Sequence, residues 1–403
     1  MQARKIKEGI YWVGGIDWSL RLFHGYSTPR GTTYNAYLVV GEKKTALIDT
    51  VKSYLSEELL ERVSSVIDLA KLDYLVCNHV EMDHSGAIPR VLERAPNATV
   101  VTCANGEKGL REHFHRDFRF QQVKTGDKLD LGGKTLSFVT TPMVHWPDNM
   151  VCYLPEDRLL FSNDSFGQHY ASPERFDDEL PLHLVVEEAQ KYFGNIVLCF
   201  LPMVAKALEA VSGLDIDMIA PSHGLIWRSH VRTILEHYKR WTSNQPEERA
   251  IVVYDTMWDS TAKMARAISG AFENRGVPAK LYDLKESHIS EIMTDVVVSR
   301  YICVGSPTLN NSILPTVASF LTYLRSLSPK KRVGLAFGSY GWGGQSIEQV
   351  NGYLKDCGFD LLEPVKAKYV PDAETLHAIT AQVEKALAGL AAPKPIAIVA
   401  PSA

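Results

Sequence analysis

The stretch His79-Val80-Glu81-Met82-Asp83-His84 carries four side chains that can bind a metal within six residues. It directly follows the apolar run Tyr74-Leu75-Val76-Cys77, which is typical of a buried strand. A loop that leaves the end of a strand can turn such side chains toward one point. Because the set mixes imidazole with carboxylate, it suits iron or manganese, whereas an all-nitrogen set would favour zinc.

The composition indicates a folded chain of two domains. With 403 residues, of which 45% are hydrophobic, the chain is long enough for two buried cores. The net charge of −4 and the lack of a basic block argue against nucleic acid as a partner. The N-terminus lacks the apolar core of a signal peptide, and the apolar run 196–208 is too short to span a bilayer and contains Lys206. We therefore expect no membrane association.

The cysteines argue for a reducing compartment. The six are Cys77, Cys103, Cys152, Cys199, Cys303 and Cys357. They are widely spaced and form no C-x-x-C pair, so neither a disulfide framework nor a thiolate-held metal is expected. This pattern fits a cytoplasmic protein.

A polar segment at 243–249, which contains Pro246, separates two differently patterned halves. We expect one domain over 1–248, a second over 249–390, and an extended Pro/Ala-rich tail over 391–403. In the second half, strands are expected at 250–254, 280–284, 301–305, 333–337 and 361–370, and helices at 261–275, 315–324, 345–357 and 375–387. This alternation predicts a parallel sheet covered on both faces, of the doubly wound, flavodoxin-like α/β type.

The first half mixes strands and helices less regularly. Strands are expected at 36–40, 45–49, 99–103, 134–139, 151–154 and 158–161, and helices at 57–67, 87–93 and 231–241. The segment 41–44 looks like a hairpin turn between the first two strands.

Three more candidate ligands follow strands: His145, Asp164 and His223. Any one of them alone is more often a hydrogen-bonded loop histidine or a turn aspartate. Their occurrence in this order, together with the cluster at 79–84, favours a metal site. Seven ligands are too many for one tetrahedral ion and suit two ions that share a carboxylate.

The order Asp49, His79-x-x-x-Asp83-His84, His145, Asp164, His223 resembles the metallo-β-lactamase fold, an αββα sandwich. With Glu81 where that fold usually has His, and with a flavodoxin-like domain following, the whole chain resembles the flavodiiron proteins. It is most similar to the stand-alone members that act as rubredoxin-dependent oxygen reductases.

The resemblance implies a role for each ligand candidate. His79, Glu81 and His145 would hold the iron nearer the flavin, and Asp83, His84 and His223 would hold the other. Asp164 would bridge the two irons, together with an oxo or hydroxo group. In some family members the counterpart of His84 swings away and water replaces it. Asp49 is expected to orient a ligand rather than to bind.

Three loops after successive strands are expected to hold FMN. The first enters a helix, where hydroxyls and free N–H groups form a phosphate site, and it resembles the flavodoxin phosphate loop with Asp259 in place of the internal Gly. The expected contacts are Thr256, Met257, Trp258, Asp259, Ser260 and Thr261; Ser306, Pro307, Thr308, Leu309, Asn310 and Asn311; and Ser339, Tyr340, Gly341, Trp342, Gly343 and Gly344. FAD or NAD is disfavoured because no G-x-G-x-x-G follows the first strand.

The resemblance implies an oxidoreductase that reduces O2 to water with four electrons, or NO to N2O with two. Electrons would come through FMN from rubredoxin or a similar small donor, which must be a separate protein because no C-x-x-C module is present. It also implies a head-to-tail homodimer, or a tetramer built from it, in which the FMN of one subunit faces the irons of the other.

Two residues outside the ligand set are candidates for the substrate pocket. His24 matches a pocket-lining position of the family and could donate a proton, although an exposed loop histidine is the alternative. Tyr192 is a weaker candidate, because a core aromatic on a helix has the same pattern. Trp146 could shield the site or pack beside Pro147. No role is assigned to His113, His115, His169 or His183.

Two other functions compete with this one. A zinc hydrolase fused to a flavodoxin-like domain would contain zinc and cleave a thioester or lactam. A non-enzymatic electron carrier or gas sensor would bind the same cofactors without rapid consumption of O2 or NO. A flavin serves no purpose in hydrolysis, whereas a flavin beside two redox-active irons serves electron transfer, which favours the oxidoreductase.

Overall fold

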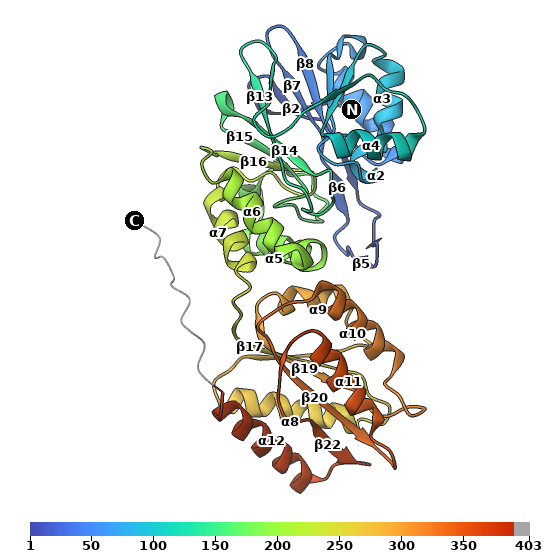
Figure 1. Cartoon of the computed structure of the whole chain (residues 1–403), viewed down its shortest axis with the longest axis vertical. Helices are drawn as coiled ribbons and strands as arrows, with labels where there is room; N and C mark the ends of the chain where they lie inside the picture. The colour runs from blue at the N-terminus through green and yellow to red at the C-terminus, as the bar shows by residue number, and fades with distance from the viewer. Residues whose placement is uncertain (391–403) are drawn as a thin grey trace. The chain divides into compact units, whose positions relative to one another are not determined.

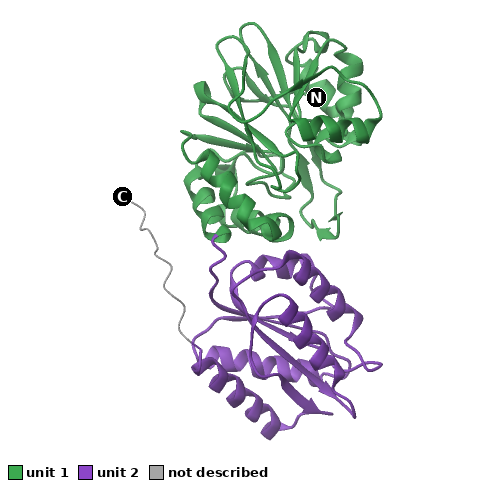
Figure 2. Ribbon diagram, viewed as in Figure 1, with its two compact units in different colours: residues 1–242 green, residues 243–403 purple. Residues whose placement is uncertain are grey.

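The computed structural model describes residues 1–390, so the expected tail at 391–403 lies outside the described residues. The chain divides into two compact units, Met1–Thr242 and Ser243–Ala403 (Figure 2). This division falls at the start of the polar segment, earlier than the expected boundary at 248, which lies inside the strand β17 (Glu247–Tyr254).

Unit 1 contains two stacked sheets (Figure 1). The first has the strand order β1 (Arg4–Lys7), β2 (Ile10–Trp12), β7 (Tyr37–Val40), β8 (Thr45–Ile48), β9 (Tyr74–Val76), β10 (Thr99–Thr102), β11 (Phe120–Gln122). The second has the order β12 (Lys128–Asp130), β13 (Thr135–Thr140), β14 (Met150–Leu154), β15 (Leu159–Asn163), β16 (Met218–Pro221). Strands β7 and β8 are antiparallel neighbours, which confirms the predicted hairpin.

Alternation along the strands decides which core each side chain joins. Val39 packs between the two sheets with Phe138 and Phe161, whereas its neighbour Leu38 packs against helices on the other face. These helices are α1 (Ser56–Ser64), α3 (Ile88–Arg94) and α4 (Ala104–Phe114). The second sheet is covered by α5 (Leu182–Tyr192), α6 (Leu201–Val211) and α7 (Val231–Thr242) (Figure 1). The predicted αββα sandwich is thus confirmed, and each fully buried Leu or Val contributes about 1.5–3 kcal/mol to it.

Helices α5 and α6 belong to one continuous helical run, Leu182–Val211, joined by a π-helical turn at Phe193–Val197 and a 3-10 turn at Leu198–Phe200. By length and composition alone this run could cross a membrane, because its most apolar window has a mean hydropathy of 1.6. That window is 39% buried inside the protein. The apolar run 196–208 noted in the sequence therefore covers only part of this longer helical run. A single such helix is weak evidence for a membrane protein, since core helices have the same composition.

Unit 2 is a parallel sheet in the order β18 (Ala279–Asp283), β17, β19 (Ser299–Gly305), β20 (Val333–Tyr340), β21 (Asp360–Leu361), with β22 (Val365–Lys368) also on β20. Its helices are α8 (Ser260–Asn274), α9 (Ile289–Val296), α10 (Pro315–Leu327), α11 (Gln345–Asp356) and α12 (Ala373–Ala388). Numbered by their order in the chain, the strands lie side by side as 2-1-3-4-5. This is the doubly wound, flavodoxin-like order that was predicted.

Three details of unit 2 differ from the sequence-based expectation. The last strand, expected at 361–370, is split into β21 and β22 around Pro364, which has no N–H for a sheet hydrogen bond. Strand β20 continues to Tyr340 because β22 pairs with its end. Helix α9 was not predicted.

Candidate metal centre and flavin site

The seven predicted ligands all come from segments that follow strands of unit 1. His79 and Glu81 follow β9, and Asp83 and His84 lie on α2 (Met82–Ser85), a short helix where a loop was expected. The other three, His145, Asp164 and His223, follow β13, β15 and β16 respectively. The strands end at one edge of the sandwich, and this edge brings side chains from distant parts of the chain together.

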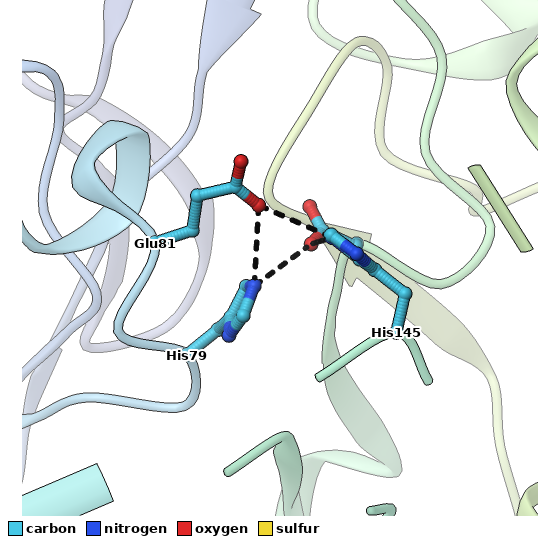
Figure 3. Close-up of side chains that lie close together, drawn as sticks. His79, Glu81 and His145 are labelled. Carbon is cyan, nitrogen blue, oxygen red and sulfur yellow. Dashed lines mark hydrogen bonds and ion pairs between the residues drawn. The ribbon is translucent and has the colours of Figure 1, made fainter. Parts of the chain in front are cut away.

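The first group consists of His79, Glu81, His145 and Asp164, whose ligand atoms all lie within 4.8 Å of one another. Glu81 Oε2 is 3.3 Å from His79 Nε2 and 3.2 Å from His145 Nε2 (Figure 3). His145 Nε2 is also 3.4 Å from Asp164 Oδ2. The two imidazoles and the Glu81 carboxylate thus point to a common centre.

The second group consists of Asp83, His84 and His223. His223 Nε2 lies 3.2 Å from Asp83 Oδ2, and His84 Nε2 lies 3.4 Å from Asp83 Oδ1. His84 therefore points into this group and does not swing away from it.

Asp164 lies between the two groups. Its Oδ2 faces His79 and His145, whereas its Oδ1 is 3.0 Å from His84 Nε2 and 3.3 Å from His223 Nε2. One carboxylate with an oxygen toward each group is the arrangement that two ions sharing a bridge require.

These residues fit two metal ions. Two ligand atoms that are each about 2.1 Å from one ion lie about 3.0 Å apart at a right angle and about 3.4 Å apart at the tetrahedral angle. Most of the distances above fall in this range. In addition, both carboxylate oxygens of Asp83 and Asp164 and both ring nitrogens of His84 are buried without a hydrogen-bond partner among the described residues. Buried polar atoms are rarely left this way unless an ion or water satisfies them.

The carboxylates favour a positive charge at the histidine nitrogens. Burial opposes a charge on His79, but hydrogen bonds with Asp148 and Glu81 outweigh it and raise the pKa of His79 to about 10. Burial is likewise outweighed at His223, where Asp164 and Asp83 raise the pKa to about 10. The pKa of the Asp164 carboxyl lies well below its usual range in spite of burial, chiefly because of the charge of His84. A metal cation replaces these protons at the same nitrogens when it binds.

A second layer of contacts fixes the ligands. Asp148 Oδ2 lies 2.9 Å from His79 Nδ1 and accepts a hydrogen bond from the Val80 N–H at 2.8 Å. His223 Nδ1 lies 2.8 Å from the Thr33 carbonyl oxygen. Such partners fix which ring nitrogen faces the metal. Asp148 was not singled out in the sequence, although it lies three residues after His145.

Asp49, expected to orient a ligand, contacts the residues that directly precede two ligands instead. Its carboxylate accepts hydrogen bonds from the Asn78 N–H at 2.7 Å and from the Asn78 and Asn163 side chains at 3.0 and 3.4 Å. Asn78 precedes His79 and Asn163 precedes Asp164, so this buried carboxylate ties two ligand segments together.

His24 lies at the tip of a two-residue hairpin between β4 (Leu22–Phe23) and β5 (Tyr26–Ser27). His24 and Gly25 have φ values of 50° and 83°, as a type I′ turn requires. The His24 side chain is 71% exposed, and its Nε2 is 3.2 Å from Glu81 Oε1. The structure therefore places it at the open side of the first group.

Tyr192 is buried at the end of α5, and its ring centroid is 5.9 Å from that of His223. It is thus a core aromatic that also borders the second group. The ring of Trp146 packs edge-on against His79 at 5.0 Å, which shields that ligand from solvent.

His169, to which the sequence gave no role, lies beside the second group. Its ring is 4.8 Å from that of His223 and 5.2 Å from that of Tyr192. Its Nδ1 is 2.8 Å from Thr32 Oγ1, and its Nε2 is buried without a hydrogen-bond partner among the described residues. Burial, with the nearby charge of His223, holds the pKa of His169 well below its usual range, so the ring is neutral. No sequence signal distinguishes it from His113, His115 or His183.

The three predicted flavin loops lie at one edge of the sheet of unit 2. They follow β17, β19 and β20, which are adjacent and parallel. The chain leaves β17 toward β18 on one side and leaves β19 toward β20 on the other, so the switch point lies between β17 and β19. Thr261 Oγ1 is 3.1 Å from Ser339 Oγ, and the Thr308 N–H donates to the Ser339 carbonyl at 3.1 Å, so the loops contact one another. Ser339 and Tyr340 belong to β20 itself rather than to the third loop.

The first loop fits a phosphate. Asp259 has a φ of 59°, a left-handed conformation that Asp tolerates and that explains why it can replace a Gly here. Its side chain does not cap α8, which leaves the N–H groups of this helix end available to an anion. Thr256 Oγ1 is buried without a hydrogen-bond partner in the described chain. Trp258 in this loop and Trp342 in the third loop are 84% and 90% exposed, as flat side chains that stack on a flavin ring would be.

Comparison with known proteins agrees with the fold of both units. The ODP family beta lactamase model matches residues 32–224, and the flavodoxin model matches residues 252–381. The rubredoxin-oxygen oxidoreductase of Megalodesulfovibrio gigas is 43% identical over 96% of this chain and 98% of its own. The chain belongs to the flavodiiron protein family. The nitric oxide reductase of Moorella thermoacetica is 45% identical over 93% of this chain and 96% of its own. The crystal structure of the flavodiiron protein from Giardia intestinalis superposes with a TM-score of 0.93, at 32% identity over 96% of each chain.

In this flavodiiron protein, as the sequence predicted, a lactamase-like unit carries the histidine and carboxylate cluster and a flavodoxin-like unit follows it. The six cysteines are free, and five of them are buried.

Proposed function

We propose that this chain is an oxidoreductase that reduces O2 to water or NO to N2O. Its predicted cofactors, FMN and a pair of irons, are confirmed by family membership. When bound, the flavin and irons supply the electrons that convert O2 and four protons into two waters, or two NO and two protons into N2O and water. The observation that carries the proposal is Asp164, whose two oxygens face two separate groups of ligands.

In this proposal, His79, Glu81 and His145 would hold one iron, and Asp83, His84 and His223 would hold the other. Asp164 would contribute an oxygen to each iron. Asp148 and the Thr33 carbonyl keep His79 and His223 in the orientation that presents Nε2 to the metal. The mixed nitrogen and oxygen donors suit iron better than zinc.

For FMN, we assign the phosphate to Thr256, Ser260, Thr261 and the first N–H groups of α8. The ring would lie between the loops that carry Trp258 and Trp342. The remaining predicted contacts, Met257, Asp259, Ser306, Pro307, Thr308, Leu309, Asn310, Asn311, Ser339, Tyr340, Gly341, Gly343 and Gly344, stay assigned to the same pocket.

His24 and Tyr192 would line the substrate pocket from its two sides. His24 lies next to Glu81 at the solvent side, where it can hold a proton near its Nε2 and pass it inward. Tyr192 lies at the buried side, next to His223 and His169. Burial and the nearby carboxylates raise its pKa well above the ordinary value, so it keeps its hydroxyl proton as a hydrogen-bond donor.

A head-to-tail homodimer accounts for two exposed apolar surfaces. Trp18, Leu22, Tyr54 and Met82 are exposed near the metal groups, and Met257, Trp258 and Trp342 are exposed around the flavin loops. Apolar side chains that gather on a surface mark interaction sites. Their burial against each other between two copies would place the FMN of one subunit at the irons of its partner.

The donor is proposed to be rubredoxin, the protein named in the relative from Megalodesulfovibrio gigas. A cytoplasmic location is proposed because the cysteines are free.

The test is a single turnover of the anaerobically reduced holoenzyme mixed with O2 or, separately, with NO. We expect rapid reoxidation of the flavin, with water or N2O as the product and about two irons and one FMN per chain. Zinc in place of iron, with hydrolysis of a thioester or lactam, would refute the proposal in favour of the fused hydrolase. Slow reoxidation with intact cofactors would favour a carrier or sensor.

A further inference from the structure

An apolar cavity lies between the second sheet of unit 1 and the helices that cover it. Its walls include Val144, Val151, Leu160, Phe166, Val204 and Leu208. Leu159 and Phe161 on β15 face the core between the sheets, so Leu160 between them faces the helices. The cavity is therefore outside the sandwich core, under α6.

Two residues of the inner wall are chain neighbours of predicted ligands. Val144 directly precedes His145, and Phe166 follows Asp164 by two residues. Both side chains are buried. The outer end of the wall includes Ala207 and Leu208 on α6, which are partly exposed. The cavity thus lies between α6 and the segments that carry two predicted ligands.

The cavity lining has few free hydrogen-bonding groups that could hold a water molecule. The Ser162 hydroxyl donates to the Ser165 carbonyl oxygen at 2.7 Å, and the Tyr238 hydroxyl accepts the Phe166 N–H at 2.7 Å. The Ser162 and Tyr238 oxygens are thus paired within the wall. Thr141 and Ser165 are the other polar residues of the lining, and the remainder is aliphatic or aromatic. A water needs two to four polar partners to occupy a cavity, and apolar cavities that lack them stay dry and take up xenon or small apolar molecules.

We propose that this cavity is a binding site and an entry route for the diatomic gas, O2 or NO. The inference rests on the proposed function and adds the path by which its substrate arrives. O2 and NO are small and weakly polar, so they partition from water into such a space. If the partner subunit covers the open side at His24, as proposed above, the gas needs a second entry to the metal centre. The cavity under α6 would be that entry.

The experiment uses crystals of the holoenzyme pressurised with xenon, which probes the cavity independently of turnover. We expect xenon density between Val144, Leu160 and Val204 in the wild type. Ala207→Phe, which fills the outer end, should abolish it. The matched control is Ala210→Phe, on the exposed side of the same helix, which should retain the density.

Kinetics supply the second measurement. Ala207→Phe should lower kcat/KM for O2 or NO about tenfold, with kcat at saturating gas and the rate of reduction by the donor unchanged. If Ala207→Phe fails to fold, Ala207→Leu, with fewer added atoms, should lower kcat/KM in the same direction while retaining full FMN and iron content. The inference would be overturned if the wild type bound no xenon or if the cavity held ordered water. It would also be overturned if Ala207→Phe lost xenon binding but kept an unchanged kcat/KM. Xenon binding in a protein that consumes neither gas would instead refute the proposed function and leave the cavity as a gas site.

Discussion

Removal of the Asp148 carboxylate should weaken iron binding without changing any ligand. Asp148 Oδ2 lies 2.9 Å from His79 Nδ1 and accepts the Val80 N–H at 2.8 Å. In Asp148→Ala both buried donors lose their partner, and His79 loses the contact that directs its Nε2 to Glu81. Loss of such a partner lowers metal affinity about 10- to 100-fold, equivalent to about 1.4–2.7 kcal/mol. Asp148→Asn, which keeps one acceptor oxygen, should lose less.

The assay is iron retention in a series of chelator concentrations, followed by the iron content of the desalted protein. Asp148→Ala should lose its first iron at about 10- to 100-fold lower chelator activity than the wild type. Asp215→Ala is the matched control, because the Asp215 carboxylate is exposed and pairs with Arg158 at the surface. Retention equal to the wild type in Asp148→Ala would show that this carboxylate does not orient His79.

Three other changes test other parts of the structure. Thr256→Val should weaken FMN binding about tenfold or more in calorimetric titration of the apo-flavoprotein, because a hydrogen bond to a charged group is worth about 1.5–3 kcal/mol. The control Thr322→Val, at an exposed position of α10, should leave FMN affinity unchanged. Leu22→Asp should shift the dimer toward monomer in light scattering and lower turnover, whereas Thr322→Asp, at an exposed position of α10, should not; a fully active monomer would refute the dimer. Burial raises the pKa of Glu188 above 4.5, its value in the unfolded chain, so the folded protein releases this proton at a higher pH than the unfolded chain does. The free energy of unfolding therefore falls as the pH rises from 4.5 through the pKa of the folded state. The urea midpoint of Glu188→Gln relative to wild type should therefore increase from pH 4.5 upward, and a constant difference would contradict this.

The gathering of the predicted ligands could be expected from the sequence because each follows a strand. His145, Asp164 and His223 come one to five residues after strand ends, and such positions reach one edge of a sandwich whatever the length of the intervening chain. The flavin loops were predictable for the same reason, since parallel strands place all their carboxyl ends on one side.

The supporting residues were not predictable, because their partners are distant in the chain. Asp148 and His79 are separated by 69 residues, and no local pattern links a loop aspartate to a particular imidazole. His169 contacts His223 only because β15 and β16 pair in the second sheet. The strand β20 was expected to end at Phe337, but pairing with β22, which is distant in the chain, extends it to Tyr340.

The turn that carries His24 restricts which residues evolution can place there. Its two central residues need positive φ, a conformation that Gly, Asn and Asp adopt readily, His less often, and β-branched side chains rarely. Relatives that dispense with this imidazole are therefore expected to carry Asn, Asp or Gly at the position, or to have a longer loop. A mutational scan would show the same restriction, with Val and Ile losing the hairpin and Asn losing only the imidazole.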